Sequence, residues 1–142
     1  MRYWISVVSL NHVRAGMEGG FTQADHGARS RLDRLSKGDA IVFYSPRTEL
    51  RAGDPVQRFT AMAEVVDDAP FEAATVGEAP SPWRRLVRFI DCEEAPARPL
   101  LEELEFIRDK KSWGVAFRRG FFEIGEADYH RLARAMRAAA AA

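Results

Sequence analysis

The chain has 142 residues, of which 46% are hydrophobic, and its 21 basic and 21 acidic side chains give a formal net charge of +0. This size and composition predict one globular domain that can bury a sizeable core. The charge balance argues against a protein that coats nucleic acid non-specifically, because such binding depends on many uncompensated Lys and Arg side chains. The single cysteine, Cys92, excludes an internal disulfide and a cysteine metal cluster.

The N-terminus leads directly into an expected strand from Tyr3 to Val8, rich in aromatic and β-branched residues. Alternation along this strand places Trp4 and Ser6 on one face, which suits either the edge of a core or the wall of a pocket. The segment lacks the features of a signal peptide, and no apolar run approaches the roughly 18 residues of a membrane span. We therefore expect a cytoplasmic protein that does not cross a membrane.

A short helix is expected next, capped by Ser9 or Asn11 and ended by Gly16. The stretch from Gly19 to Pro46 then concentrates aromatic and polar side chains on irregular backbone beside a rigid strand, which is where binding sites are usually built. Within it we expect a short basic helix over 30–35, with a capping box formed by Ser30 and Asp33, and a buried strand over 40–44 that stops at Ser45-Pro46.

The rest of the chain predicts strands separated by loops. The expected elements are a polar loop over 47–55, strands over 57–66, 83–90 and 121–124, a loop over 67–82, helical turns near 100–104, and a closing helix from Gly125 or Glu126. The apolar stripe of the closing helix is Tyr129, Leu132, Ala133 and Met136. We expect one domain over residues 1–137, followed by an alanine tail, 138–142, that frays.

Strands interrupted by short helices, without a regular strand–long helix alternation, indicate an α+β fold. We expect a small mixed sheet or open barrel with short helices packed at its margin. The sequence contains neither a Gly-x-x-x-x-Gly-Lys motif nor a Gly-x-Gly-x-x-Gly motif. The histidines, His12, His26 and His130, are scattered, so we expect no metal and no cofactor. His26 beside Asp25 is the one visible start of an acid–base pair, and no nucleophile accompanies it.

Two tryptophans are candidates for stacking on a planar ligand. Trp113 lies on irregular backbone next to Lys111, and Trp4 shares a strand face with Ser6. Aromatic rings around a cleft stack on nucleobases, although a core position explains either ring equally well from composition alone. Three arginines of the basic helix, Arg29, Arg31 and Arg34, are expected to point outward, either into solvent or toward phosphates.

Several short motifs, in order from Tyr3 to about Met136, resemble those of the bacterial EVE-domain family. They are Tyr3-Trp4-Ile5, Gly19-Gly20-Phe21-x-Gln23, His26-Gly27, Lys37-Gly38-Asp39, Phe43-Tyr44-Ser45-Pro46, Val65-Val66-Asp67-Asp68, Lys111-Ser112-Trp113-Gly114 and Phe122-Glu123-Ile124. The resemblance implies a PUA-like small mixed β-barrel with short helices around it. It is similar to the YTH domains, which bind methylated adenine in RNA through a tryptophan cage.

The resemblance implies a monomeric, non-enzymatic module that binds RNA or DNA carrying a modified base, with the base flipped into an aromatic pocket. The implied pocket residues are Trp4, Ser6, Gly20, Phe21, Gln23, Tyr44, Ser45 and Trp113. With such a ligand, we expect Arg29, Arg31, Arg34 and Lys111 to contact the nucleic-acid backbone. Two alternatives stay open at this point: an ASCH-type enzyme acting on a nucleoside-like amide, with His26 and Asp25 in its site, and a small-molecule sensor that uses the same pocket.

Overall fold

The structure, a computed structural model, describes residues 1–24, 29–73 and 82–139, so the predictions for Asp25, His26 and Gly27 lie outside the described residues. The strands and α-helices are β1 (Tyr3–Val7), α1 (Leu10–Gly19), β2 (Phe21–Thr22), β3 (Ala40–Glu49), β4 (Ala52–Val65), β5 (Phe71–Glu72), β6 (Trp83–Ile90), β7 (Ala95–Pro96), β8 (Phe121–Ile124) and α2 (Glu126–Ala135). The 3-10 helices are η2 (Leu32–Arg34), η3 (Arg98–Leu100) and η4 (Trp113–Arg119).

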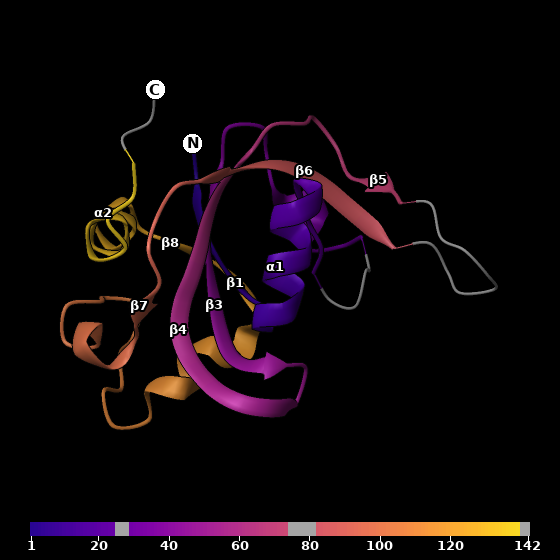
Figure 1. Cartoon of the computed structure of the whole chain (residues 1–142). Helices are drawn as coiled ribbons and strands as arrows, with labels where there is room; N and C mark the ends of the chain where they lie inside the picture. The colour runs from indigo at the N-terminus through magenta and orange to yellow at the C-terminus, as the bar shows by residue number, and fades with distance from the viewer. Residues whose placement is uncertain (25–28, 74–81, 140–142) are drawn as a thin grey trace.

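The strands form one mixed sheet whose order is β2-β6-β4-β3-β1-β8, with β5 beside β6 and β7 beside β4 (Figure 1). β1 and β3 pair in parallel, and their other neighbours in the sheet are antiparallel. The long strands β3 and β4 bend strongly, so the sheet curls into a half-barrel (Figure 1). The α+β fold with a curled mixed sheet and short helices is therefore confirmed.

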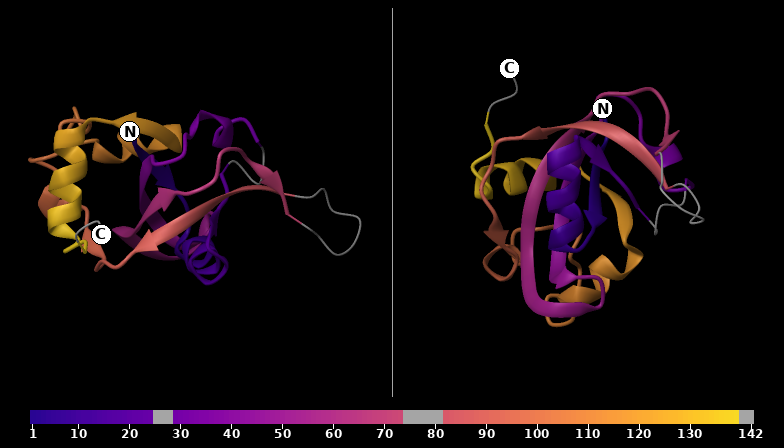
Figure 2. Two further views of the ribbon diagram at one scale, coloured as in Figure 1. Left: turned by 90° about the horizontal axis from the view of Figure 1, so that it is seen from above. Right: turned by 45° about the vertical axis from the view of Figure 1, so that its right-hand side comes forward.

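Each side of the sheet is covered by different elements. Val13 of α1, together with Leu32 and Leu35 at η2, packs on Trp4 and its neighbours on one side. On the other side, Phe117 of η4 and the α2 residues Leu132 and Met136 pack on a separate core. In Figures 1 and 2, α1 lies against β3 and α2 lies well away from it, on the side of β8.

The β3–β4 hairpin is longer than the sequence suggested. The polar loop predicted over 47–55 is wrong, because β3 continues to Glu49 and β4 begins at Ala52. The register between the two strands shifts after Phe43 and again after Ser45. Such bulges leave residues unpaired and bend the strand, which lets Pro46 lie inside it without removing a needed ladder bond. The hairpin therefore extends well past the predicted stop at Ser45-Pro46.

Two helix predictions also need correction. The first helix does not end at Gly16 but runs to Gly19 and closes on Gly20, which has a φ of 70°. Gly16 is instead a contact point, since a Cβ there would lie 2.4 Å from the carbonyl oxygen of Phe21. The helix expected over 30–35 is only the short η2, and the Asp33 carboxylate pairs with Arg29 rather than capping.

Several predictions of the C-terminal half are confirmed. The strands over 83–90 and 121–124 are β6 and β8, and the closing helix begins at Glu126 as α2. The predicted loop over 67–82 contains the short β5, and its residues 74–81 lie outside the described part. Beyond α2, the amides of Ala138 and Ala139 donate to the carbonyl oxygens of Ala133 and Asp91, at 2.9 and 2.8 Å.

Candidate nucleic-acid interface

A small hollow lies between α1, β2 and β6, and we call it the α1 hollow. Its volume is about 230 Å³. This is smaller than the roughly 300–1,000 Å³ of sites for drug-sized ligands, so it suits one small ring system. Its walls combine apolar and aromatic side chains with a few polar ones. The lining residues are Val8, His12, Val13, Ala15, Gly16, Phe21, Thr22, Gln23, Phe43, Arg84 and Phe89.

Three side chains of this hollow are bound to one another. The Arg84 guanidinium lies 3.7 Å above the centre of the Phe21 ring, and its Nε donates to Gln23 Oε1 at 2.5 Å. Thr22 of β2 pairs with Arg85 of β6 in an antiparallel register. The next residue, Gln23, therefore lies opposite Arg84. A guanidinium is only a donor, so the Gln23 carbonyl oxygen must face it and the orientation of the amide is fixed.

Backbone geometry places Phe21 at the rim of the hollow. The left-handed conformation of Gly20 reverses the chain after α1, and its amide donates to the Gly16 carbonyl oxygen at 2.7 Å. The carbonyl oxygen of Gly20 then accepts from the Val87 amide at 3.0 Å. Gly20, which was predicted as a pocket residue, therefore acts by directing β2 against β6.

A second hollow, the arginine cleft, adjoins the first and shares Val8, His12 and Gln23 with it. Its volume is about 580 Å³, and it opens between α1, the β3–β4 hairpin and the end of η4. Four guanidinium groups and one carboxylate line it, so the local field is positive although the whole chain is neutral. These residues are Arg31, Arg47, Arg51, Arg118 and Glu49.

Local contacts hold two of these arginines. Arg47 donates from Nε to the Ala52 carbonyl oxygen at 3.2 Å and from Nη2 to the Gly53 carbonyl oxygen at 2.7 Å. The Arg31 guanidinium packs over Gly120, where a Cβ would lie 2.5 Å from Nη1. Any side chain at position 120 would therefore displace Arg31.

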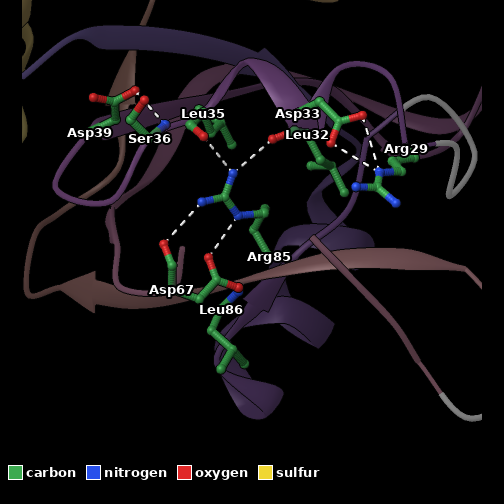
Figure 3. Close-up of polar contacts among 9 residues, drawn as sticks. All are labelled: Arg29, Leu32, Asp33, Leu35, Ser36, Asp39, Asp67, Arg85 and Leu86. Atoms are coloured by element: carbon green, nitrogen blue, oxygen red, sulfur yellow. Dashed lines mark hydrogen bonds and ion pairs between the residues drawn. The ribbon is translucent and has the colours of Figure 1, made fainter. Parts of the chain in front are cut away.

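Arg85 anchors η2, the helical turn that follows Arg31. The Arg85 side chain is completely buried, and its Nη1 donates to the carbonyl oxygens of Leu32 and Leu35 at 2.8 and 2.6 Å (Figure 3). Its Nε donates to the Asp67 carboxylate at 2.7 Å, and the other oxygen of that carboxylate accepts from the Leu86 amide (Figure 3). The network fixes η2 against β6 and so helps to position the arginine cleft.

Comparison with known proteins places this geometry in a family. The model of the EVE domain matches residues 2–135. The chain belongs to the EVE-domain family. A UPF0310 protein of Mycolicibacterium vanbaalenii is 48% identical over 136 residues, covering 96% of this chain and 93% of the relative. The UPF0310 protein YdcG of Bacillus subtilis is 36% identical over 138 residues, covering 94% of this chain and 91% of the relative.

Solved structures share the fold of this EVE domain at low sequence identity. The YTH domain-containing protein mmi1 in a complex with RNA aligns with a TM-score of 0.63 and 12% identity, covering 95% of this chain and 80% of that one. A hypothetical protein from Leishmania major aligns with a TM-score of 0.56 and 16% identity, covering 94% and 93%. At these identities the likeness establishes the fold alone.

Four of the pocket residues predicted for the EVE domain are buried: Trp4, Ser6, Tyr44 and Ser45. Trp4 is 1% exposed, stacks on Phe121 with ring centres 5.0 Å apart, and donates from Nε1 to Asp39 at 3.0 Å. Ser6 and Ser45 are also buried, and the Ser45 hydroxyl bonds that of Thr60 at 2.8 Å. Of the predicted pocket set, only Phe21 and Gln23 line the α1 hollow.

Tyr44 and Trp113 lie on the other side of the EVE domain's sheet. Tyr44 stacks on Phe117 with ring centres 3.8 Å apart, and burial raises its pKa to about 12 despite the opposing field of Arg98. Trp113 meets Phe117 edge-on at 6.1 Å and lines a third hollow, of about 720 Å³, with Phe106. The structure therefore does not bring these two side chains together with Phe21 and Gln23.

Among the predicted backbone contacts, only Arg31 lines the arginine cleft. Arg29 pairs with Asp33 at 3.0 Å and lies over the Trp83 ring, while Arg34 lies 4.9 Å from the centre of the Trp4 ring. Lys111 is exposed on the far segment that precedes η4. Sequence reasoning missed several residues of the two hollows: His12, Arg47, Arg51, Arg84 and Arg118.

One signal could have identified Arg84 as a neighbour of Gln23: two consecutive arginines, Arg84 and Arg85, in an otherwise strand-like run must point to opposite faces. Within the described residues, no group of three or more His, Cys, Asp or Glu side chains is arranged to hold a metal ion. In the same part of the chain, no helix combines the length and apolar character needed to span a membrane.

Proposed function

We propose that this EVE domain is a nucleic-acid-binding module that accepts one flipped base in the α1 hollow and holds the adjoining phosphates in the arginine cleft. The observation that carries the proposal is the adjacency of the two hollows, which share Val8, His12 and Gln23. The small hollow suits a single ring system, and the larger one carries positive charge. The RNA complex of mmi1, which has the same fold, supports a nucleic-acid partner for this chain.

In this proposal the base and the nucleic-acid backbone are bound by different interactions. Phe21 offers a ring on which a base can stack, and Arg84 and Gln23 offer polar contacts to the edge of the base. The cleft arginines attract phosphates through charge and release counterions, so affinity falls as salt rises. Removing a base from its stack costs a few kcal/mol, and this favours single-stranded targets or targets whose modified base stacks poorly.

In this proposal the protein is a cytoplasmic monomer that binds RNA or DNA carrying a modified base and does not turn its ligand over. Trp4, Ser6, Tyr44, Ser45 and Trp113 are not part of the proposed pocket wall, because they are packed within or against the two cores. Their contribution is to hold β1, β3 and η4 in place around the two hollows.

Fluorescence anisotropy with short labelled RNA and DNA strands, each carrying one modified base, tests this proposal. We expect binding that weakens as salt rises and that Arg118→Gln reduces, whereas Arg137→Gln, on the exposed C-terminal turn, leaves it unchanged. Free nucleosides are tested in parallel, both for binding and for chemical turnover. Binding of free nucleosides without any binding of strands would contradict the proposal and favour a small-molecule sensor, and their hydrolysis or deamination would favour an enzyme.

A further inference from the structure

We infer that Arg84 determines which bases enter the α1 hollow. The geometry points to an uncharged base with two adjacent hydrogen-bond acceptors on one edge, the property of guanine and cytosine, and against adenine. This inference rests on the proposed function, because it concerns the ligand of the same hollow. It comes from hydrogen-bonding groups in the lining of the α1 hollow that the described residues leave without a partner.

The polar groups of the Arg84–Gln23 pair are almost all donors. Arg84 donates its Nε–H to Gln23 Oε1. The described residues provide no hydrogen-bond acceptor for its other N–H groups, on Nη1 and Nη2. Because Gln23 must turn its carbonyl oxygen toward Arg84, its amide NH₂ is the group left for a ligand. The pair therefore offers donors to a base and asks for acceptors in return.

The common bases differ in whether they can supply such an edge. Guanine presents O6 and N7 side by side, the pair that arginine contacts in a bidentate manner. Cytosine presents O2 and N3 as neighbours on its pairing edge. Adenine has only one acceptor, N1 or N7, on each side of its N6 amino donor. Against a guanidinium fork, adenine therefore leaves one N–H without a partner.

The position of Arg84 also disfavours a positively charged base. The guanidinium lies 3.7 Å above the Phe21 ring and already occupies the aromatic face that would otherwise attract a cation. A base made cationic by methylation would then meet a like charge in a hollow partly screened from water. Neutral modifications, such as a methyl group on carbon, leave the acceptor pair and the charge unchanged.

The test uses single-stranded RNA with one variable base in a constant context and measures affinity by anisotropy. We expect guanine or cytosine to bind on the order of tenfold or more tightly than adenine. We expect 7-deazaguanine, which loses one acceptor, and cationic 7-methylguanine to lose most of this preference. Arg84→Lys keeps the charge but removes the planar fork, so it should reduce the preference to near unity. Arg88→Lys is the matched control, because Arg88 lies on the same strand but pairs with Glu64 on the surface.

The outcomes separate the two proposals. The inference is overturned, and the proposed function stands, if RNA binds in a salt-dependent way but adenine at the variable position gives an affinity equal to or higher than guanine and cytosine. A preference that survives Arg84→Lys would also overturn it. If Arg84→Lys folds poorly, Gln23→Leu frees the same guanidinium from its partner and should weaken the preference. Absence of any strand binding by the wild type would refute the proposed function and the inference together.

Discussion

The aromatic rings around η4 pack on one another, whereas Phe21, at the rim of the α1 hollow, packs on a cation. Tyr44, Phe117 and Trp113 surround each other at centre-to-centre distances of 3.8 to 6.4 Å. Phe21 instead has Arg84 above it and a hollow beside it. In the proposed function Phe21 can contact a ligand because it borders a hollow, whereas the rings around η4 are largely occupied by one another.

The two sides also differ in how they use charge. The α1 side contains the completely buried Arg85, which bonds the backbone of η2 and the Asp67 carboxylate. On the η4 side the packed core is a cluster of apolar and aromatic residues, and the buried Asp128 carboxylate of α2 accepts from the amides of Glu105 and Phe106 at its edge. Stability on the α1 side should therefore respond to the loss of a charge, and stability on the η4 side to the ionisation of a ring hydroxyl.

The largest expected effect is that of Arg85→Met. The substitution removes the guanidinium that pairs with Asp67 and donates to the carbonyl oxygens of Leu32 and Leu35, and breaking a buried pair in this way costs about 3–5 kcal/mol. Urea unfolding of the variant measures the loss. Arg88→Met is the control, since the exposed pair with Glu64 should contribute at most about 1 kcal/mol. Equal stabilities for the two variants would contradict the anchoring role of Arg85.

The next largest effect concerns alkaline pH and Tyr44. Burial raises the pKa of Tyr44 from 10.0 to about 12 in the folded protein. The stability that this raised pKa represents is fully present below pH 10, the unfolded pKa, and is lost as pH rises from 10 to about 12. The loss is about 2–3 kcal/mol, because each pKa unit corresponds to about 1.4 kcal/mol.

Unfolding free energies measured across this pH window test the Tyr44 prediction. We expect a steep decline for the wild type and a shallower decline for Tyr44→Phe, which has no hydroxyl to ionise at this position. The same slope for both proteins would show that other groups dominate alkaline unfolding.

The fold was largely predictable from the sequence because its signals are local. The strand over 40–44 follows from a continuous apolar run bounded by turn residues, and the stripe of α2 follows from a helical period in hydrophobicity. The hairpin length was not predictable in this way. Pro46 and Pro55 are usual stop signals, and bulges in the register of β3 and β4 accommodate them.

The candidate site was predictable only in part. Phe21, Gln23 and Arg31 could be proposed because they lie in one stretch of the chain. Arg84 and Arg118 reach the same region from distant strands and turns, so only the sheet topology reveals them. Trp4 and Trp113 were attractive because tryptophan often binds planar ligands, but the partners that cover a ring are set by tertiary packing and leave no periodic signal.

A pair of aromatic substitutions sharpens the comparison between the two sides. If Phe21 forms the stacking platform, Phe21→Ala should weaken strand binding by about 1–3 kcal/mol, roughly tenfold or more. Trp113→Ala should leave binding nearly unchanged and should lower stability more, because it removes packing against Tyr44 and Phe117. Anisotropy and thermal unfolding on both variants measure the two effects. The reverse pattern would move the base to the third hollow, where Trp113 lies.

The smallest expected effect is on the salt dependence of binding. Arg51 and Arg118 line the arginine cleft from the hairpin tip and from η4, and replacing either by Gln keeps most of its length while removing the charge. If each contacts one phosphate, each variant should reduce the slope of log affinity against log salt by about 0.7–0.9. The ranking of bases should not change, because phosphate contacts carry no sequence information. Arg137→Gln, whose side chain is 78% exposed beside Glu93, should leave the slope as it is in the wild type. A slope that falls equally in all three variants would indicate diffuse attraction to the whole surface, and the arginine cleft would lose its assigned role.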